Sequence, residues 1–202
     1  MNRNLIAILR GVTPAEVVDI TAAIIEAGIS SIEVPLNSPD AFNSIELLAS
    51  QFGESALVGA GTVLTVEDVE QVAAVGGKLI VSPNCNPEVI RATKAHAMFS
   101  YPGVMTATEC FLALENGADG LKFFPSSLLG AAGLAALKAV LPPSAETYAV
   151  GGVGPDNFAE WINAGASGFG IGTGIYKPGF TVADVASRAE SIVAAYDQCQ
   201  SR

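Results

Sequence analysis

Short apolar runs alternate along the chain with longer alanine-rich stretches in which apolar residues recur at helical spacing. The short runs predict eight strands, at residues 5–9, 31–36, 57–61, 79–82, 98–101, 120–124, 147–150 and 168–171. The longer stretches predict eight helices, near residues 14–27, 40–52, 66–75, 87–96, 106–116, 130–140, 156–164 and 182–198. Proline near the first helical turn, as at Pro14 and Pro87, and glycine at the return, as at Gly28 and Gly117, support these boundaries.

This regular alternation predicts an α/β protein built on a parallel sheet. Eight consecutive βα units without a linker or low-complexity tract indicate one (β/α)8 TIM-barrel domain over residues 1–202. An open doubly wound sheet is the alternative, but nothing interrupts the alternation where a second layer would begin. The barrel bears on function, because catalytic residues in such barrels lie at the carboxyl ends of the strands and in the loops that follow.

Polar residues and glycines gather at these predicted strand ends, whereas the strand interiors are apolar. The set is Arg10, Glu33, Pro35, Asn37, Gly61, Thr62, Pro83, Asn84, Pro102, Lys122, Ser126, Gly151, Gly152, Gly172 and Thr173. This distribution is expected of an enzyme. The sequence leaves open whether Asn37, Pro83, Asn84 and Pro102 contact a substrate or only shape the rim.

Lys122 lies within an apolar strand, where an ammonium group is costly to bury unless it is paired or neutral. Desolvation favours the neutral amine, which is a nucleophile. Because strand side chains alternate, bulky Leu121 and Phe123 are expected to face the helices, which turns Lys122 and Phe124 into the barrel lumen. Alternatively, Lys122 extends its charge out of the strand end or pairs with a buried carboxylate.

The same alternation points Glu33 inward, and Arg10 ends the first predicted strand. A carboxyl group beside an amine suits proton transfer, and the planar guanidinium group of arginine suits a carboxylate or a phosphate. The structural alternatives are a buried ion pair of Glu33 with Lys122 or Arg10, and an ion pair of Arg10 at the rim.

Glycines follow the last two predicted strands, as Gly151-Gly152 and as Gly172 and Gly174 around Thr173. Glycine lets the backbone approach an anion, and exposed amides can then hold a phosphate. The loops after strands seven and eight are the usual phosphate site of this architecture. Ser126 and Ser127 could add hydroxyl donors, and the alternative is that the glycines only permit tight turns.

The composition of the chain limits the classes of molecule that it is expected to bind. The formal net charge of −10 argues against nucleic acid or an anionic membrane, while local cations and amides can still bind an anionic small molecule. No apolar run approaches the ~20 residues that span a bilayer. Three scattered cysteines and no secretory leader indicate the cytoplasm. A single histidine, His96, cannot build a typical zinc site, and we expect it to be structural.

Together these residues resemble the bacterial 2-dehydro-3-deoxy-phosphogluconate/phosphogalactonate aldolase family. The resemblance covers nearly the whole chain and is carried by the segments 6–14, 32–39, 58–63, 80–84, 121–125 and 149–153, and by Gly-Ile-Gly-Thr at 170–173. It implies a class I aldolase that needs no metal or cofactor and forms a homotrimer. Carried over by position, Lys122 is similar to the Schiff-base lysine and Glu33 to the general acid/base.

The resemblance also implies the substrate-binding residues. Arg10 and Thr62 are similar to the residues that bind the pyruvate end of the substrate. The residues similar to the phosphate binders are Gly151, Gly152, Gly172 and Thr173, with Ser126 as a further candidate.

Two positions separate the subgroups of the family. Gluconate-type members tend to carry arginine in the loop after the glutamate strand and threonine before the Gly-Gly pair, where this chain has Asn37 and Val150. Both residues resemble the phosphogalactonate subgroup. The implied reaction is cleavage of 2-dehydro-3-deoxy-6-phosphogalactonate to pyruvate and D-glyceraldehyde 3-phosphate. The alternatives are the phosphogluconate aldolase, a sugar-phosphate isomerase or epimerase, and a barrel that binds a phosphorylated ligand without converting it.

Overall fold

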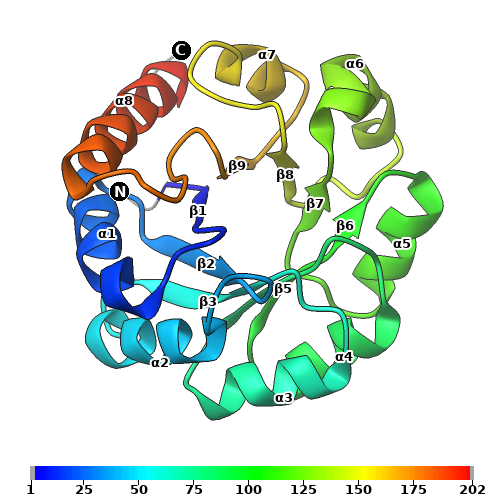
Figure 1. Cartoon of the computed structure of the whole chain (residues 1–202). Coiled ribbons are helices and arrows are strands. Elements are labelled where there is room, and N and C mark those ends of the chain that lie inside the picture. Colours follow the sequence, from blue (N-terminus) through cyan, green and yellow to red (C-terminus); the bar gives the residue numbers. More distant parts are fainter. Residues whose placement is uncertain (1–2, 201–202) are drawn as a thin grey trace.

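The computed structural model describes residues 3–200 as a ring of parallel strands surrounded by helices (Figure 1). The strands are β1 (Leu5–Ile8), β2 (Ser31–Pro35), β3 (Leu57–Gly61), β4 (Leu79–Val81), β5 (Phe99–Tyr101), β6 (Gly103–Val104), β7 (Leu121–Phe123), β8 (Thr147–Val150) and β9 (Gly168–Ile171). The helices are α1 (Pro14–Ala27), α2 (Ala41–Phe52), α3 (Val66–Ala74), α4 (Pro87–Ala95), α5 (Ala107–Glu115), α6 (Ser126–Lys138), α7 (Phe158–Asn163) and α8 (Val182–Gln200). The predicted (β/α)8 barrel is confirmed.

The described range leaves out two residues at each end of the predicted domain, 1–2 and 201–202. The chain closes on itself where α8 packs beside α1, red against blue in Figure 1. Within residues 3–200, no helix combines the length and the apolar character needed to cross a bilayer.

The fifth barrel strand is divided in two by Pro102. β5 pairs with β4 and β6 pairs with β7, so the ring closes through the single residue between them. Proline has no N–H to donate to a ladder, but its carbonyl still accepts a hydrogen bond from the backbone N–H of Lys122 at 2.9 Å. The prediction ended this strand at Tyr101, because the Pro-Gly pair that follows is typical of a turn.

The strands bury both faces. Their outward side chains form the large core between the sheet and the helices, which includes Leu121 and Phe123 as predicted. A second apolar cluster fills the lumen and consists of Ile6, Leu79, Val81, Tyr101 and Tyr148, with Leu57 against it. Side-chain alternation therefore separates a helix-facing core from a small lumen core, and polar residues that point inward stand above the latter.

Helix α6 begins earlier than predicted, at Ser126 and not near residue 130. Its first turn follows the lysine strand directly, and Gly130, at φ 70° and ψ 160°, breaks the helix before it continues to Lys138. Those dihedral angles suit glycine, which explains why the sequence pattern indicated a helix only from that residue on. α7 is also shorter than predicted, at Phe158–Asn163.

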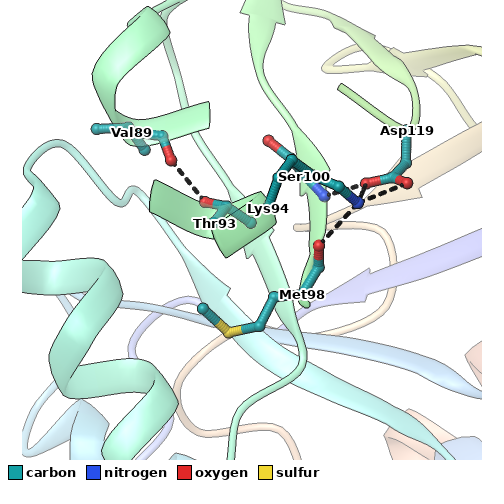
Figure 2. Close-up of polar contacts among 6 residues, drawn as sticks. All are labelled: Val89, Thr93, Lys94, Met98, Ser100 and Asp119. Carbon is teal, nitrogen blue, oxygen red and sulfur yellow. Dashed lines mark hydrogen bonds and ion pairs between the residues drawn. The ribbon is translucent and has the colours of Figure 1, made fainter. Parts of the chain in front are cut away.

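A polar network fixes β5 at its amino end (Figure 2). The Lys94 ammonium of α4 donates to both carboxylate oxygens of Asp119, at 2.9 and 2.7 Å, and to the Met98 carbonyl at 3.0 Å. Asp119 also accepts a hydrogen bond from the backbone N–H of Ser100 at 2.8 Å. Beside it, the Thr93 hydroxyl donates to the Val89 carbonyl at 2.7 Å. The network joins α4, β5 and the segment before β7 at the end of the barrel opposite the carboxyl ends of the strands.

Candidate active site

Lys122 and Glu33 meet inside the lumen, as the alternation predicted. Lys122 lies at the centre of β7 and Glu33 at the centre of β2, with 7% and 2% of their surfaces exposed. Both line one small cavity near the carboxyl ends of the strands. Among residues 3–200, no ion pair within 4 Å involves either side chain. The amine and the carboxyl group are thus neighbours without forming the buried salt bridge that was the structural alternative.

Burial sets the ionisation of this pair. It raises the pKa of Glu33 to about 7, against the opposing charges of Lys122 and Arg10. It lowers the pKa of Lys122, an effect that Glu33 opposes and Arg10 strengthens. Both shifts favour a neutral amine beside a neutral carboxyl group. Oε2 of Glu33 is buried and, in the described part of the chain, has no hydrogen-bond partner, so it is free to exchange a proton with a ligand or a water molecule.

The aromatic ring of Phe124 lies against the lysine. The Lys122 Nζ atom is 4.8 Å from the centroid of this ring, which is itself about one-third exposed at 36%. The ring covers the amine on the side of the open cleft. Phe124 was predicted to share the face of Lys122, and the structure places it there.

Arg10 stands at the rim and is exposed. Its Nη1 donates to Oδ1 of Asn37 at 2.6 Å, and no described residue forms an ion pair with it. The sequence left the role of Asn37 open, and the structure shows it holding the guanidinium group without neutralising it. The charge of Arg10 is therefore available to an anion.

A cleft of about 210 Å³ joins Arg10 to the predicted phosphate loops. Its lining includes Arg10, Phe124, Val150, Gly151, Gly152, Gly172 and Thr173. Ile8, Val150 and Gly170 line both this cleft and the cavity of Lys122 and Glu33, so the two spaces adjoin. Gly151 and Gly152 have φ angles of 89° and 81°, which favour glycine and turn their backbone into the cleft.

Two predicted binding residues have distinctive environments. Ser126 is fully buried, donates its hydroxyl to the Phe123 carbonyl at 2.7 Å and accepts the Val150 N–H at 2.8 Å, so it joins the ends of β7 and β8. This geometry favours support of the glycine loop over direct contact with an anion. Thr62, directly after β3, is half-buried with a φ angle of 56°, a strained conformation for a β-branched residue.

The family model for KDPG and KHG aldolase matches residues 1–188. The chain belongs to this family. It is 51% identical over 197 residues to the Rhizobium meliloti (strain 1021) protein named "Probable 2-dehydro-3-deoxy-6-phosphogalactonate aldolase", with 98% of this chain and 93% of that protein covered. It is 49% identical over 192 residues to the 2-dehydro-3-deoxy-6-phosphogalactonate aldolase of Escherichia coli (strain K12), with coverage of 95% and 94%.

Solved structures agree with this assignment. A structure described as "Native KDPGal structure" superposes with a TM-score of 0.98 at 46% identity, covering 100% of this chain and 98% of that one. The KDPG aldolase of Legionella pneumophila, captured with pyruvate as a covalent carbinolamine intermediate, has a TM-score of 0.82 at 26% identity, with coverage of 96% and 92%. The family resemblance found in the sequence is confirmed, and the chain is an aldolase and hence a lyase.

The structure of this aldolase gives Gly61 a role that the sequence did not reveal. Gly61 ends β3, and a Cβ atom there would overlap the carboxylate of Glu33. The buried carboxyl group thus occupies the space that a side chain at position 61 would take. The sequence identified Gly61 only as a residue at a strand end. Its role could have been inferred from the presence of a glycine at the end of the strand next to the one that carries the inward-pointing Glu33.

Proposed function

We propose that the protein is a class I aldolase that cleaves 2-dehydro-3-deoxy-6-phosphogalactonate to pyruvate and D-glyceraldehyde 3-phosphate. The observation that carries the proposal is the buried amine of Lys122, without an ion pair, beside the buried carboxyl group of Glu33, in a cavity that adjoins a glycine-walled cleft. The 49–51% identical relatives are named for this substrate. The capture of pyruvate as a carbinolamine in a family member supports covalent chemistry at a lysine.

The reaction follows from the ionisation of the pair. Neutral Lys122 attacks the C2 ketone of the substrate to form a carbinolamine. Glu33 then protonates the carbinolamine hydroxyl group, which leaves as water. The resulting iminium ion is an electron sink. Ionised Glu33 then removes the proton of the C4 hydroxyl, and the C3–C4 bond breaks to release D-glyceraldehyde 3-phosphate. Protonation of the enamine and hydrolysis of the imine release pyruvate and restore the amine.

Substrate orientation follows from the cleft. The phosphate binds the backbone amides around Gly151, Gly152, Gly172 and Thr173, which form the outer wall. The pyruvate end lies deeper, at Lys122, with Arg10 and Thr62 as binders of its carboxylate in keeping with the family resemblance. Arg10 lines the outer cleft as well, so its charge acts on both anionic ends of the substrate.

Val150 is the proposed determinant of the C4 configuration. It lies between the two spaces, since it lines both the cavity of Lys122 and the outer cleft. An apolar side chain there offers no hydroxyl to the substrate C4 hydroxyl, whereas a threonine would. The galactonate and gluconate substrates differ in configuration at this carbon.

Covalent trapping tests the proposed role of Lys122. Incubation with pyruvate and borohydride should give one adduct at Lys122 by mass spectrometry, because reduction makes the imine permanent. Lys122→Ala should give no adduct and lose at least about 10³-fold in kcat, since the nucleophile is gone. An isomerase, an epimerase or a non-catalytic binder would form no pyruvate adduct. Wild-type turnover in Lys122→Ala would refute the proposal.

Comparison of the two C4-epimeric substrates tests specificity. We expect a higher kcat/KM for 2-dehydro-3-deoxy-6-phosphogalactonate, and we expect Val150→Thr to narrow the ratio by about tenfold, the effect of one added hydrogen bond. Val182→Thr, at the exposed start of α8, is the matched control outside the cleft and should leave the ratio unchanged. Equal rates with the two epimers, or a preference for gluconate, would refute the assignment.

The assembly and location of the enzyme are further parts of the proposal. The family resemblance supports a homotrimer, and the exposed Leu128 and Val140, at 78% and 60%, offer apolar surface for contacts between subunits. Light scattering coupled to gel filtration would measure the mass. The free cysteines Cys85, Cys110 and Cys199 agree with a reducing cytoplasm.

A further inference from the structure

Two tyrosines cross the lumen beneath the catalytic pair. Tyr101 of β5 and Tyr148 of β8 are 9% and 4% exposed, and their rings meet edge to face with centroids 4.9 Å apart. Together with Ile6 they line two cavities at once: the one that holds Lys122 and Glu33, and a cavity of about 120 Å³ that also contacts Arg3, Asn4 and Ser31. The two rings therefore form the partition between the active site and the amino end of the barrel.

Glycines on the neighbouring strands make room for this partition. A Cβ atom at Gly120 would lie 2.7 Å from Cε1 of Tyr101 and 3.1 Å from Cε2 of Tyr148. A Cβ atom at Gly168 would lie 2.6 Å from Cε1 of Tyr148. Real Cβ atoms essentially never come within 3.0 Å of another atom, so the two rings fill the volume of the side chains that the glycines lack.

Tyr148 turns its polar end away from the catalytic pair. The Tyr148 hydroxyl donates to Oε2 of Glu146 at 3.0 Å, and Glu146 is exposed and precedes β8, toward the amino end of the barrel. The partition is thus hydrogen-bonded on its lower side and presents ring carbon to Lys122 and Glu33.

We propose that Tyr101 and Tyr148 are positioning residues for the aldolase reaction, which exclude water that would reach Lys122 and Glu33 from the amino end of the barrel. The inference rests on the proposed function of Lys122 as the nucleophile. The rings touch no reacting atom, and they act by keeping the amine and the carboxyl group dry. The open cleft then supplies water only from the side where substrate binds.

Water that entered through the partition would change the pKa values of Lys122 and Glu33 in ways that both disfavour the neutral amine. The titratable or charged groups that face Lys122 are Glu33, Arg10, Tyr101 and Tyr148, and the rest of the cavity wall is aliphatic side chains and glycine. Water admitted through the partition would raise the pKa of Lys122 toward its ordinary value, because the ammonium ion would be solvated. It would also lower the pKa of Glu33, whose negative charge would raise that of Lys122 further. Both effects reduce the neutral amine at neutral pH.

The test is the pH dependence of trapping by pyruvate and cyanoborohydride, followed by mass spectrometry. Tyr148→Ala opens the partition and should move the midpoint of the trapping rate upward by about one pH unit, with a fall of about tenfold at pH 7. Tyr148→Phe keeps the ring and loses only the bond to Glu146, so its midpoint should remain that of the wild type. Tyr101→Ala opens the same partition from β5 and carries the same expectation if Tyr148→Ala fails to fold.

A matched control separates this role from simple destabilisation. Ile24→Ala removes a fully buried side chain from the helix-facing core at α1, far from the lumen, and should lower stability without moving the trapping midpoint. An unchanged midpoint in folded Tyr148→Ala or Tyr101→Ala, or a shift in Ile24→Ala of the same size, would overturn the inference. Absence of any adduct in the wild type would refute the proposed function itself, and this inference with it.

Discussion

At the scale of single residues, the active site depends on side chains that are absent as much as on those present. Lys122 and Glu33 could be placed in the lumen from strand alternation alone, because each stands between two bulky outward neighbours. The space they occupy could not be derived in this way. It is created by glycines such as Gly61, whose importance lies in contacts with strands distant in the sequence.

Gly61→Ala should therefore impair catalysis more than folding. The added methyl group overlaps the Glu33 carboxylate and displaces it, and a displacement of about 1 Å in an active site can lower kcat/KM by about 10²-fold. Steady-state kinetics of the cleavage reaction would measure this. Gly154→Ala is the matched control, since a Cβ atom there meets nothing within 4 Å. Equal kcat/KM values for the two variants would contradict the role assigned to Gly61.

At the scale of elements, the sequence predicted types and order well and some boundaries poorly. Strands β1, β2 and β3 and helices α1 and α4 begin where predicted, because apolar runs and Pro or Gly signals agree there. The start of α6 and the β6 segment were missed, because Gly130 and Pro102 are residues that usually end an element. Tertiary pairing overrides that local preference, and one sequence does not reveal pairing between distant segments.

The network around Asp119 is expected to stabilise the amino end of β5. Asp119→Ala leaves the Ser100 N–H without its acceptor and the Lys94 ammonium with the Met98 carbonyl alone, and should lower the free energy of unfolding by about 1–2 kcal/mol (Figure 2). Urea denaturation would measure it. The activity of the folded variant should be unchanged, since the network lies at the opposite end of the barrel. Exposed Glu70→Gln should change stability by less than about 0.5 kcal/mol, and a similar loss in both variants would argue against the network.

At the scale of the whole molecule, the catalytic pair opposes stability. Burial raises the pKa of Glu33 from 4.5 to about 7, so the folded protein binds more protons than the unfolded chain between these pH values. Stability from this group is present below about pH 4.5 and is lost as pH rises to about 7. A surface with a formal net charge of −10 adds general repulsion, but the buried carboxyl group contributes a defined pH window of its own.

Glu33→Gln should remove the loss of stability that the wild type shows as pH rises from about 4.5 to about 7. The amide does not ionise, so relative to the wild type the variant should gain on the order of 3 kcal/mol of unfolding free energy between pH 5 and pH 8. Denaturant unfolding at both pH values and at equal protein concentration would show it. Glu26→Gln, on the exposed face of α1, is the control, and its free energy of unfolding should change with pH in the same way as that of the wild type. A constant difference between Glu33→Gln and the wild type across pH would contradict the buried, protonated state.

The hydrogen bond between Arg10 and Asn37 has a consequence for engineering. The sequence resemblance gives gluconate-type members an arginine in the loop after the glutamate strand, where this chain has residues 37–39, and replacement of Asn37 by arginine is one way to introduce it. In this barrel, that replacement would remove the acceptor that orients Arg10 and place a second guanidinium group beside the first. A redesign of substrate preference at residue 37 therefore has to supply a new acceptor for the Arg10 guanidinium group.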